Sequence, residues 1–259
     1  MVRLATNAMA TRFELVLEGA DRVQLLAVGE LAIERIDEAH RALTRYEASS
    51  LLAHLRRVAP RMVAVDAPIL GLFEAINHVV VASEGRFDPS LGCGWDRVRI
   101  NHAESTLGFA DPDLDLDLGG IGKGYAIDLA VATFKEYGIE SAFIHGGTSS
   151  GYGLGSPKGT SGWNVRFAGN GGPTIPLCDQ GYAVSATHQA RDGELVGQLV
   201  DPWTGALVRE SRRVAVIGPS AALADGWATA ALLTAERPMA LSSAWQVWLQ
   251  RNDQPWIAI

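Results

Sequence analysis

The strongest constraint on the fold is a long amphipathic helix predicted from Asp21 to about Arg45. Its apolar residues recur at steps of three and four, namely Leu25, Val28, Ala32, Ile36, Ala39 and Leu43. This spacing puts them on one stripe of the helix, which needs a second layer of structure to cover it. With 259 residues, the chain is long enough to bury a large core against that stripe.

Local patterns predict the remaining elements. Helices are expected at about 48–57, 69–80 (closed by Gly85), 123–137 and 222–235. Strands are expected at 11–17, 62–65, 141–145, 164–167, 181–185, 197–200 and 213–217, with a hairpin in the last 16 residues. The strictly alternating segment 113–120 (DLDLDLGG) is predicted to be a further strand. These runs of helices and strands predict an α+β fold. Because no internal repeat or linker divides the chain, residues 1–259 are expected to form one domain.

Amino-acid composition limits the kinds of molecule that the protein is expected to bind. The net charge is −7 and the 22 Lys and Arg residues are scattered, so no nucleic-acid partner is expected. A small anionic ligand remains compatible, because backbone amides and a metal ion can hold phosphate in an acidic protein. The two cysteines form no CxxC pair, and no segment has the length of a membrane span or the apolar core of a signal peptide. With no lipid-attachment cysteine near the N-terminus either, a cytoplasmic protein is expected.

The strongest local motif is DLGGIGKGYAID at 117–128. Its glycines let the backbone approach a ligand, and Lys123 adds a positive charge where a helix begins, which suits an anion. It is not a Walker A loop, because Gly124 follows the lysine, and its glycine spacing differs from the dinucleotide fingerprint. The alternative interpretation is a glycine-rich turn with a surface lysine.

Two later motifs also carry polar groups. Asp225 and Thr229 are four residues apart on a predicted helix, so their oxygens share one face and suit a hard cation such as Mg²⁺. The alternative is that Asp225 only caps the first turn of that helix. The segment 201–205 (DPWTG) contains Asp, Pro and Gly, which favour turns, and is predicted to form a turn at the end of a strand. The alternative interpretation is a plain hairpin turn.

One segment matches a serine-hydrolase motif in part. Residues 147–151 match G-x-S-x-G, but this motif needs a helix directly after it. The continuation Tyr152 to Pro157 is rich in glycine and ends in proline, so it is not expected to form a helix.

Taken in order, the segments resemble the ApbE family, the FAD:protein FMN transferases. The resemblance rests on residues 9–11 (MAT), 44–46 (TRY), 49–51 (SSL), 85–89 (GRFDP), 117–128, 146–147 (GG), 201–205 and 224–230 (ADGWATA). It implies an ApbE-like, T-fold-like mixed domain with antiparallel sheets and flanking helices. It also implies a Mg²⁺-dependent transfer of FMN from FAD to a Thr or Ser hydroxyl of a target flavoprotein, with release of AMP.

The same resemblance implies the site residues. Metal ligands would be Gly120, Asp225, Ala228 and Thr229, and FAD contacts would be Met9, Tyr46, Arg86, Phe87, Asp88, Asp117, Lys123 and Leu199. Lys123 and Gln198 are the catalytic candidates, and Gln198 stands where the family usually has a histidine. Two alternatives remain open, a flavin-binding protein without transfer activity and an FAD pyrophosphate hydrolase.

Overall fold

The computed structural model describes residues 1–92, 94–191, 194–197, 201 and 205–259. Its centre is an eight-stranded sheet in the order β1-β2-β6-β7-β10-β13-β14-β15, in which every pair is antiparallel. The strands are β1 (Val2–Ala8), β2 (Thr11–Glu18), β6 (Ser141–Gly146), β7 (Ser150–Leu154), β10 (Gln180–Ala186), β13 (Arg212–Gly218), β14 (Gln246–Arg251) and β15 (Ile257–Ala258).

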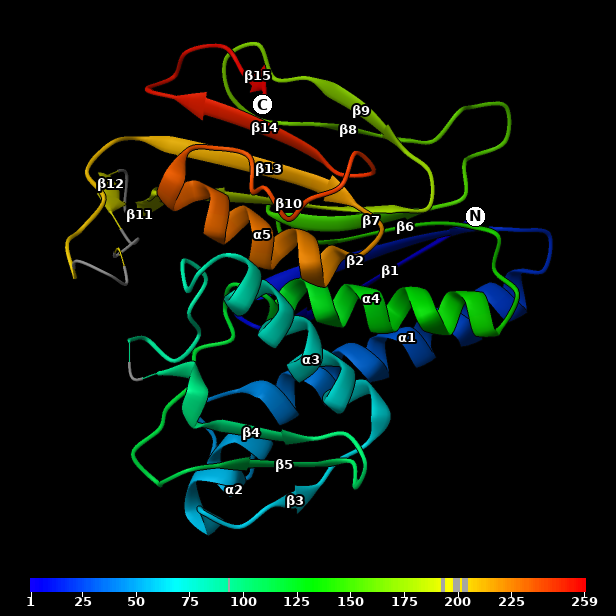
Figure 1. Ribbon diagram of the computed structural model, residues 1–259. Coiled ribbons are helices and arrows are strands. Elements are labelled where there is room, and N and C mark those ends of the chain that lie inside the picture. Colours follow the sequence, from blue (N-terminus) through cyan, green and yellow to red (C-terminus); the bar gives the residue numbers. More distant parts are fainter. Residues whose placement is uncertain (93, 192–193, 198–200, 202–204) are drawn as a thin grey trace.

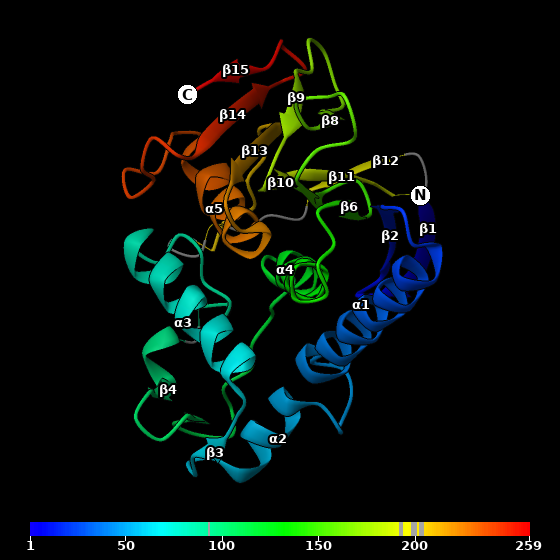
Figure 2. The same cartoon turned by 90° about the vertical axis from the view of Figure 1, so that its right-hand side faces the viewer.

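Three helices cover one face of this sheet: α1 (Arg22–Leu43), α4 (Gly122–Glu136) and α5 (Ala221–Thr234) (Figure 1). Figure 2 looks nearly along α4, which lies in the middle between α1, α5 and the sheet. Its central position explains why α4 buries residues around most of its circumference, including Tyr125, Ile127 and Phe134. The main core is formed between the sheet and these helices.

Smaller elements extend this architecture on both sides. Below the helices lie α3 (Ala67–Ala82), α2 (Leu51–Val58) and a sheet of order β3-β5-β4 (Figure 1). Its strands are β3 (Val63–Ala64), β5 (Thr106–Phe109) and β4 (Val98–Asn101), the last preceded by the 3-10 turn η1 (Trp95–Arg97). The hairpin of β8 (Trp163–Arg166) and β9 (Thr174–Leu177) packs near the opposite face of the main sheet, over a second apolar cluster. Another hairpin joins β11 (His188–Arg191) to β12 (Glu194–Gly197).

The long predicted helix is confirmed as α1. All six apolar residues of the predicted stripe are buried, and the Asp21 side chain caps the helix by accepting hydrogen bonds from the Val23 and Gln24 amides. The α+β fold with antiparallel sheets is confirmed as well. The predicted hairpin near the C-terminus is present as β14 and β15.

The predicted strand at 113–120 is wrong. Leu114, Leu116 and Leu118 are buried as the alternation implies, but the segment pairs with no strand in the described residues. Its other face carries Asp115 and Asp117, which pair with Arg45 instead. The alternating pattern therefore predicted correctly which side chains are buried, but it does not indicate whether another strand lies alongside to form hydrogen bonds.

Other boundaries shift by a few residues. Helix α2 begins at Leu51 rather than near Ala48, because the Ser50 side chain caps it by accepting a hydrogen bond from the Ala53 amide at 3.1 Å. The strand expected at 197–200 ends at Gly197 as β12, and its other residues lie outside the described part of the chain. Strands β1, β4, β5, β7, β9 and β11 were not predicted. Because β7 rather than a helix follows Ser149, the structure excludes the serine-hydrolase interpretation of residues 147–151.

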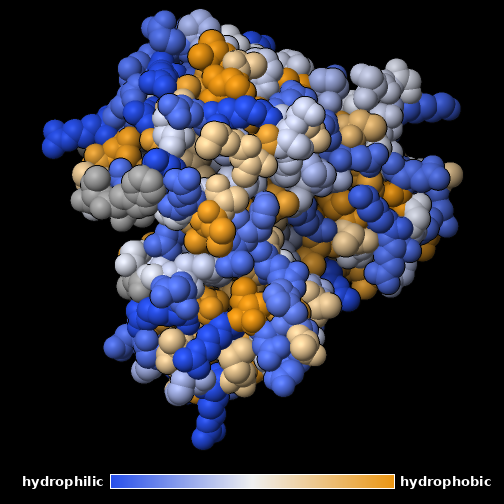
Figure 3. All heavy atoms as spheres, viewed as in Figure 1, coloured by the Kyte–Doolittle hydropathy of each residue, from blue (hydrophilic) through white to orange (hydrophobic). Residues whose placement is uncertain are grey.

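The described surface is mixed in character. On the face shown in Figure 3, hydrophobic side chains form separate small patches among hydrophilic ones. No helix in the described residues combines the length and the hydrophobicity required to cross a bilayer.

Candidate functional site

The glycine motif forms a turn that leads directly into α4. The Gly122 amide donates to the Leu118 carbonyl at 2.7 Å, and no side chain caps the helix start. The Lys123 ammonium folds back and donates to the Gly119 carbonyl at 3.0 Å. One oxygen of Asp117 accepts the Gly119 amide at 2.8 Å, which fixes the turn from its other end. The turn thus presents backbone and a lysine at an uncapped helix N-terminus, where an anion is stabilised.

Asp225 is not a helix cap. Helix α5 begins at Ala221, and the Ser220 side chain caps it by accepting the Leu223 amide at 3.1 Å. Asp225 lies in the second turn with only 3% of its surface exposed, so the capping alternative is wrong. The Thr229 hydroxyl donates to the Asp225 carbonyl at 3.1 Å, which leaves its oxygen lone pairs available to a ligand.

The glycine turn and α5 meet at these polar groups. The Lys123 ammonium lies 3.4 Å from one oxygen of the Asp225 carboxylate. A Cβ atom built on Gly120 would lie 3.1 Å from the Thr229 hydroxyl oxygen. Gly120 therefore adjoins Thr229, and Lys123 adjoins Asp225, at the place where the glycine turn meets α5. The remaining predicted metal ligand, Ala228, precedes Thr229 on the same helix and its side chain is buried.

The electrostatics of Asp225 are those of a poorly compensated buried charge. Burial raises the pKa of its carboxyl, and Lys123 and the Gly124 amide oppose this shift from contacts that are both 3.4 Å long. In the described residues, no three His, Cys, Asp or Glu side chains gather at one place. The further protein ligands of a cation at Asp225 would consequently be hydroxyl and carbonyl oxygens.

The glycines of the motif have different roles. A Cβ atom on Gly124 would lie 2.2 Å from the Ala221 carbonyl oxygen, so this glycine permits close packing of α4 on α5. A Cβ atom on Gly122 would meet nothing nearer than the Met9 sulfur at 3.9 Å. The prediction that all the glycines serve a ligand is therefore wrong for Gly124, whose space is taken by another helix.

Two further side chains border the Gly120–Thr229 region. The buried Phe87 ring would lie 3.1 Å from a Cβ atom on Gly120, which places the predicted FAD residue Phe87 against the turn. The Ser185 hydroxyl of β10 lies 3.5 Å from that of Thr229. Sequence reasoning missed Ser185, because nothing in the local pattern of a strand reveals its contact with a helix 44 residues away.

Arg45 connects the turn to the segment before α2. One nitrogen of its guanidinium lies 3.3 Å from the second oxygen of Asp117, and the guanidinium also pairs with Asp115. Arg45 lies over the ring of Tyr46 at 6.0 Å from its centroid. Tyr46 is 88% exposed, so its ring is available for contact with a ligand or a partner.

Met9 approaches the same helix start from the β1–β2 turn. Met9 and Ala10 both adopt left-handed backbone angles, with φ of 50° and 56°. The Met9 amide donates to His40 Nδ1 on α1 at 3.4 Å, and the Met9 sulfur faces Gly122. The two non-glycine residues at positive φ store backbone strain beside the candidate site.

The loop after α3 holds the remaining FAD candidates. The Gly85 amide donates to the Val80 carbonyl at 2.8 Å with φ of 77°, which confirms a glycine at the end of α3. The Arg86 amide donates to the Ser83 carbonyl at 3.1 Å. The Asp88 carboxylate accepts the Ser90 and Gly92 amides at 2.8 and 3.0 Å, so it organises its own loop.

Gln198 and Leu199 lie outside the described residues. Of the turn predicted at 201–205, the structure describes only the two ends: the Asp201 amide donates to the Ala206 carbonyl at 2.9 Å, and Gly205 has φ of 66°. Residues 202–204 lie outside the described part of the chain.

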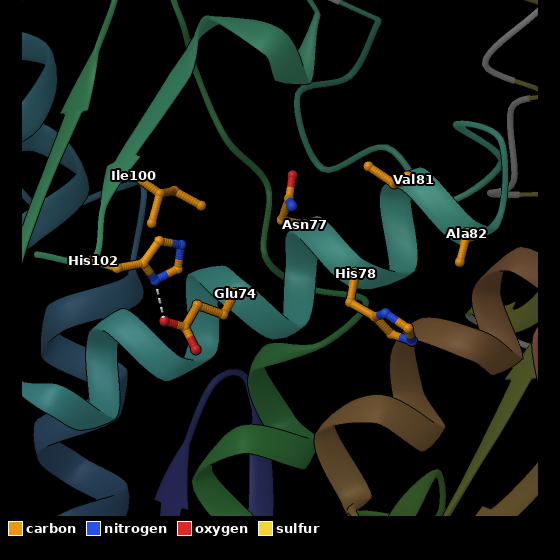
Figure 4. A pocket seen from close by; sticks show the side chains of 7 residues that line it. All are labelled: Glu74, Asn77, His78, Val81, Ala82, Ile100 and His102. Atoms are coloured by element: carbon orange, nitrogen blue, oxygen red, sulfur yellow. Dashed lines mark hydrogen bonds and ion pairs between the residues drawn. The ribbon is translucent and has the colours of Figure 1, made fainter.

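A separate groove of about 520 Å³ lies along α3 (Figure 4). Its lining residues are Glu74, Asn77, His78, Val81, Ala82, Ile100 and His102. Inside it, Glu74 and His102 are hydrogen bonded at 2.6 Å, and Asn77 accepts the Trp95 indole N–H at 3.0 Å. None of the predicted site residues lines this groove.

The chain is similar to known proteins of one family. The model of the ApbE family matches residues 91–246. An FAD:protein FMN transferase of Chlamydia trachomatis is 27% identical over 249 residues, which cover 82% of this chain and 78% of that protein.

Solved structures share the fold. The ApbE protein of Thermotoga maritima matches with a TM-score of 0.83 at 17% identity, over 99% of this chain and 96% of that one. The flavin transferase ApbE of Vibrio cholerae matches with a TM-score of 0.81 at 20% identity, over 99% and 96% of the two chains. A family match across more than half of the chain, together with this fold, means that the protein belongs to the ApbE family.

Proposed function

We propose that this protein transfers the FMN moiety of FAD to a Ser or Thr hydroxyl of a target flavoprotein, with a divalent cation such as Mg²⁺ and with release of AMP. The observation that carries the proposal is the approach of the glycine turn to α5, where Lys123 pairs with the Asp225 carboxylate and Gly120 adjoins the Thr229 hydroxyl. Family membership supports an enzyme of this class. The main core draws residues from both ends of the chain, which supports one flavin-transferase domain over residues 1–259.

The donor set fits a hard cation. The Asp225 carboxylate, the Thr229 hydroxyl and the carbonyl oxygens of Gly120 and Ala228 would hold it, and oxygen donors of this kind suit Mg²⁺. A bound cation would also compensate the buried charge of Asp225, whose present contacts are long. When bound, the cation supplies positive charge beside the pyrophosphate of FAD.

Residues around the turn would bind FAD. The α4 N-terminus and Lys123 favour the phosphates, since both supply positive potential. Contacts to the rest of FAD are proposed for six described residues and for Leu199, which lies outside the described part of the chain. The six are Met9, Tyr46, Arg86, Phe87, Asp88 and Asp117.

The chemistry is one phosphoryl substitution. The acceptor hydroxyl oxygen forms a bond to the phosphorus of the FMN half, and the bond from that phosphorus to the AMP oxygen breaks. Lys123 stabilises the charge that develops on the departing AMP phosphate. Gln198 can orient the acceptor by hydrogen bonding, but its neutral amide takes up no proton at pH 7, so the hydroxyl proton is released to water.

The test uses the full chain with FAD, Mg²⁺ and a candidate flavoprotein. AMP is measured by chromatography, and covalent flavin is measured by fluorescence of the acceptor in a denaturing gel. We expect AMP and flavinylated acceptor in equal amounts, and neither with EDTA or with an acceptor whose target hydroxyl is removed. Bound FAD without AMP would support the flavin-binding alternative, which Gln198 favours, and AMP without acceptor would support the hydrolase.

Gln198→His tests the role of that position. A histidine supplies the general base that Gln198 lacks, and a base contributes on the order of 10²–10⁴ in rate. We expect a faster transfer rate at saturating FAD with unchanged FAD affinity. Gln198→Asn is the matched control, because it keeps a neutral amide. An unchanged rate in Gln198→His would assign proton removal to another group.

A further inference from the structure

Asp128 of α4 holds the start of a different helix. Its two carboxylate oxygens accept the Ser220 hydroxyl at 2.7 Å, the Ala221 amide at 2.9 Å and the Ala222 amide at 3.0 Å. These donors belong to the first turn of α5, where backbone amides otherwise lack partners. The carboxylate therefore binds α5 to α4 through charge-assisted hydrogen bonds, which are stronger than neutral ones.

Helix α5 does not need this carboxylate merely to begin. Ser220 already caps it by accepting the Leu223 amide at 3.1 Å. The contact spans 92 residues of sequence and fixes the position of α5 relative to α4. Burial raises the pKa of the Asp128 carboxyl and its three hydrogen bonds oppose that shift, as expected of a carboxylate held between packed elements.

The same two helices carry the candidate site. Helix α4 bears Lys123 about one turn before Asp128, and α5 bears Asp225 one turn after Ala222. The spacing between the Lys123 ammonium and the Asp225 carboxylate therefore depends on how the two helix starts are joined. Groups in a binding constellation have to be held within about 0.5 Å of their working geometry.

We propose that Asp128 is a positioning residue, which sets the ligand Asp225 against the glycine turn and so determines the affinity for the divalent cation. This inference rests on the proposed function. The hydrogen bonds that join Asp128 to α5 reach the first turn of that helix and not Asp225 itself. Asp128 therefore acts on Asp225 through the helix backbone. Loss of a group that is hydrogen bonded directly to a metal ligand typically weakens metal binding by about 10–100-fold, and for Asp128, which acts one step further away, we expect the lower end of this range.

The experiment measures cation binding directly. The full chain with FAD at a fixed concentration is titrated with Mn²⁺, and free Mn²⁺ is followed by electron paramagnetic resonance. We expect Asp128→Ala to weaken Mn²⁺ binding about tenfold or more. The Mn²⁺ affinity of Asp128→Asn should lie between those of Asp128→Ala and the wild type. The amide keeps one acceptor oxygen, but its NH₂ group is a donor that faces other donors. FAD affinity in EDTA should change far less than the Mn²⁺ affinity.

Asp21→Ala is the matched control. Asp21 caps α1 through the Val23 and Gln24 amides at 2.8 and 3.1 Å, so its removal also costs a helix cap. Because α1 bears none of the proposed metal ligands, this variant should bind Mn²⁺ like the wild type. Hydrogen exchange should quicken at the α5 amides in Asp128→Ala and not in Asp21→Ala.

The outcomes separate the two proposals. Wild-type Mn²⁺ affinity in a folded Asp128→Ala would overturn the positioning role while leaving the proposed function intact. If Asp128→Ala does not fold, wild-type affinity in Asp128→Asn overturns it in the same way. A wild-type chain that binds no Mn²⁺ with FAD would overturn the proposed function, and the positioning role with it.

Discussion

At the scale of single residues, Asp225 combines burial with weak compensation. Its carboxylate is almost fully buried, and its two polar contacts are each 3.4 Å long. A buried carboxylate without close partners lowers stability, because water solvates the charge better than the protein does. This cost in stability is expected if the role of the Asp225 carboxylate is to bind a ligand.

Asp225→Asn tests that view. The change keeps the shape and removes the buried charge, while the Lys123 side chain, which is 21% exposed, can still be solvated by water. We therefore expect the ligand-free protein to gain about 1 kcal/mol in free energy of unfolding. Stabilisation by Mg²⁺ with FAD should be lost in the same variant. Urea denaturation with EDTA and with Mg²⁺ plus FAD measures both effects. A variant less stable than the wild type in EDTA would show instead that the Lys123–Asp225 pair is stabilising.

Ala10 offers a second residue-scale test. Its left-handed backbone, with φ of 56°, strains any residue with a Cβ atom. We expect Ala10→Gly to raise the free energy of unfolding by about 0.5 kcal/mol, the relief of strain exceeding the added freedom of the unfolded chain. Ala8→Gly, two residues earlier in β1, is the control and should lower stability. Lower stability of Ala10→Gly, measured by chemical denaturation, would contradict the strain.

At the scale of elements, the contact between α4 and α5 positions the candidate site. Gly124 lets the backbone of α4 touch that of α5 at Ala221, and Gly181 of β10 does the same from the sheet, where its Cβ would lie 2.6 Å from the Ala221 amide. Asp128 adds hydrogen bonds at the same place. The start of α5 is therefore fixed from two sides, which holds Asp225 and Thr229 in place.

Gly124→Ala should disturb this contact. The added methyl would overlap the Ala221 backbone, and overpacking of this kind typically costs about 1–3 kcal/mol. Gly122→Ala, in the same helix but with its nearest contact at 3.9 Å, should lose no stability. Thermal denaturation of the two variants makes the comparison. Equal stability of Gly124→Ala and the wild type would mean that α5 can move away without loss.

The element scale also shows the limit of pattern reading. Residues 113–120 alternate as a strand does, yet no described strand pairs with them. Alternation reports which side chains are buried, and a strand also requires a neighbour that local sequence does not name. The helices were predicted more reliably because their hydrogen bonds are local.

At the scale of the whole molecule, ligand binding should stabilise the fold. A ligand that binds only the folded state, at a concentration 100 times its dissociation constant, raises the free energy of unfolding by about 2.7 kcal/mol. For a chain of this size, that raises the thermal midpoint by about 5–10 °C. We expect this rise with FAD and Mg²⁺ together, and a smaller one with FAD in EDTA. An equal rise in EDTA would show that the cation takes no part in FAD binding.

The site was predictable from sequence only in pieces. Asp225 and Thr229 could be placed on one helical face by their spacing, and Lys123 could be placed at a helix start. The family resemblance linked these pieces to a flavin and a metal ion. Neither spacing nor resemblance indicated that Ser220 caps α5, that Ser185 adjoins Thr229, or that Asp128 joins two helices.

What the sequence determined by itself is local: the apolar stripe of α1, the approximate extent of the helices, and the oxygen-bearing residues on α5. These features depend on contacts within a few residues, so periodicity and capping chemistry reveal them. The tertiary structure alone decided which of these groups meet. Lys123 and Asp225 are 102 residues apart, and their approach depends on two helix backbones packing without side chains between them at Gly124.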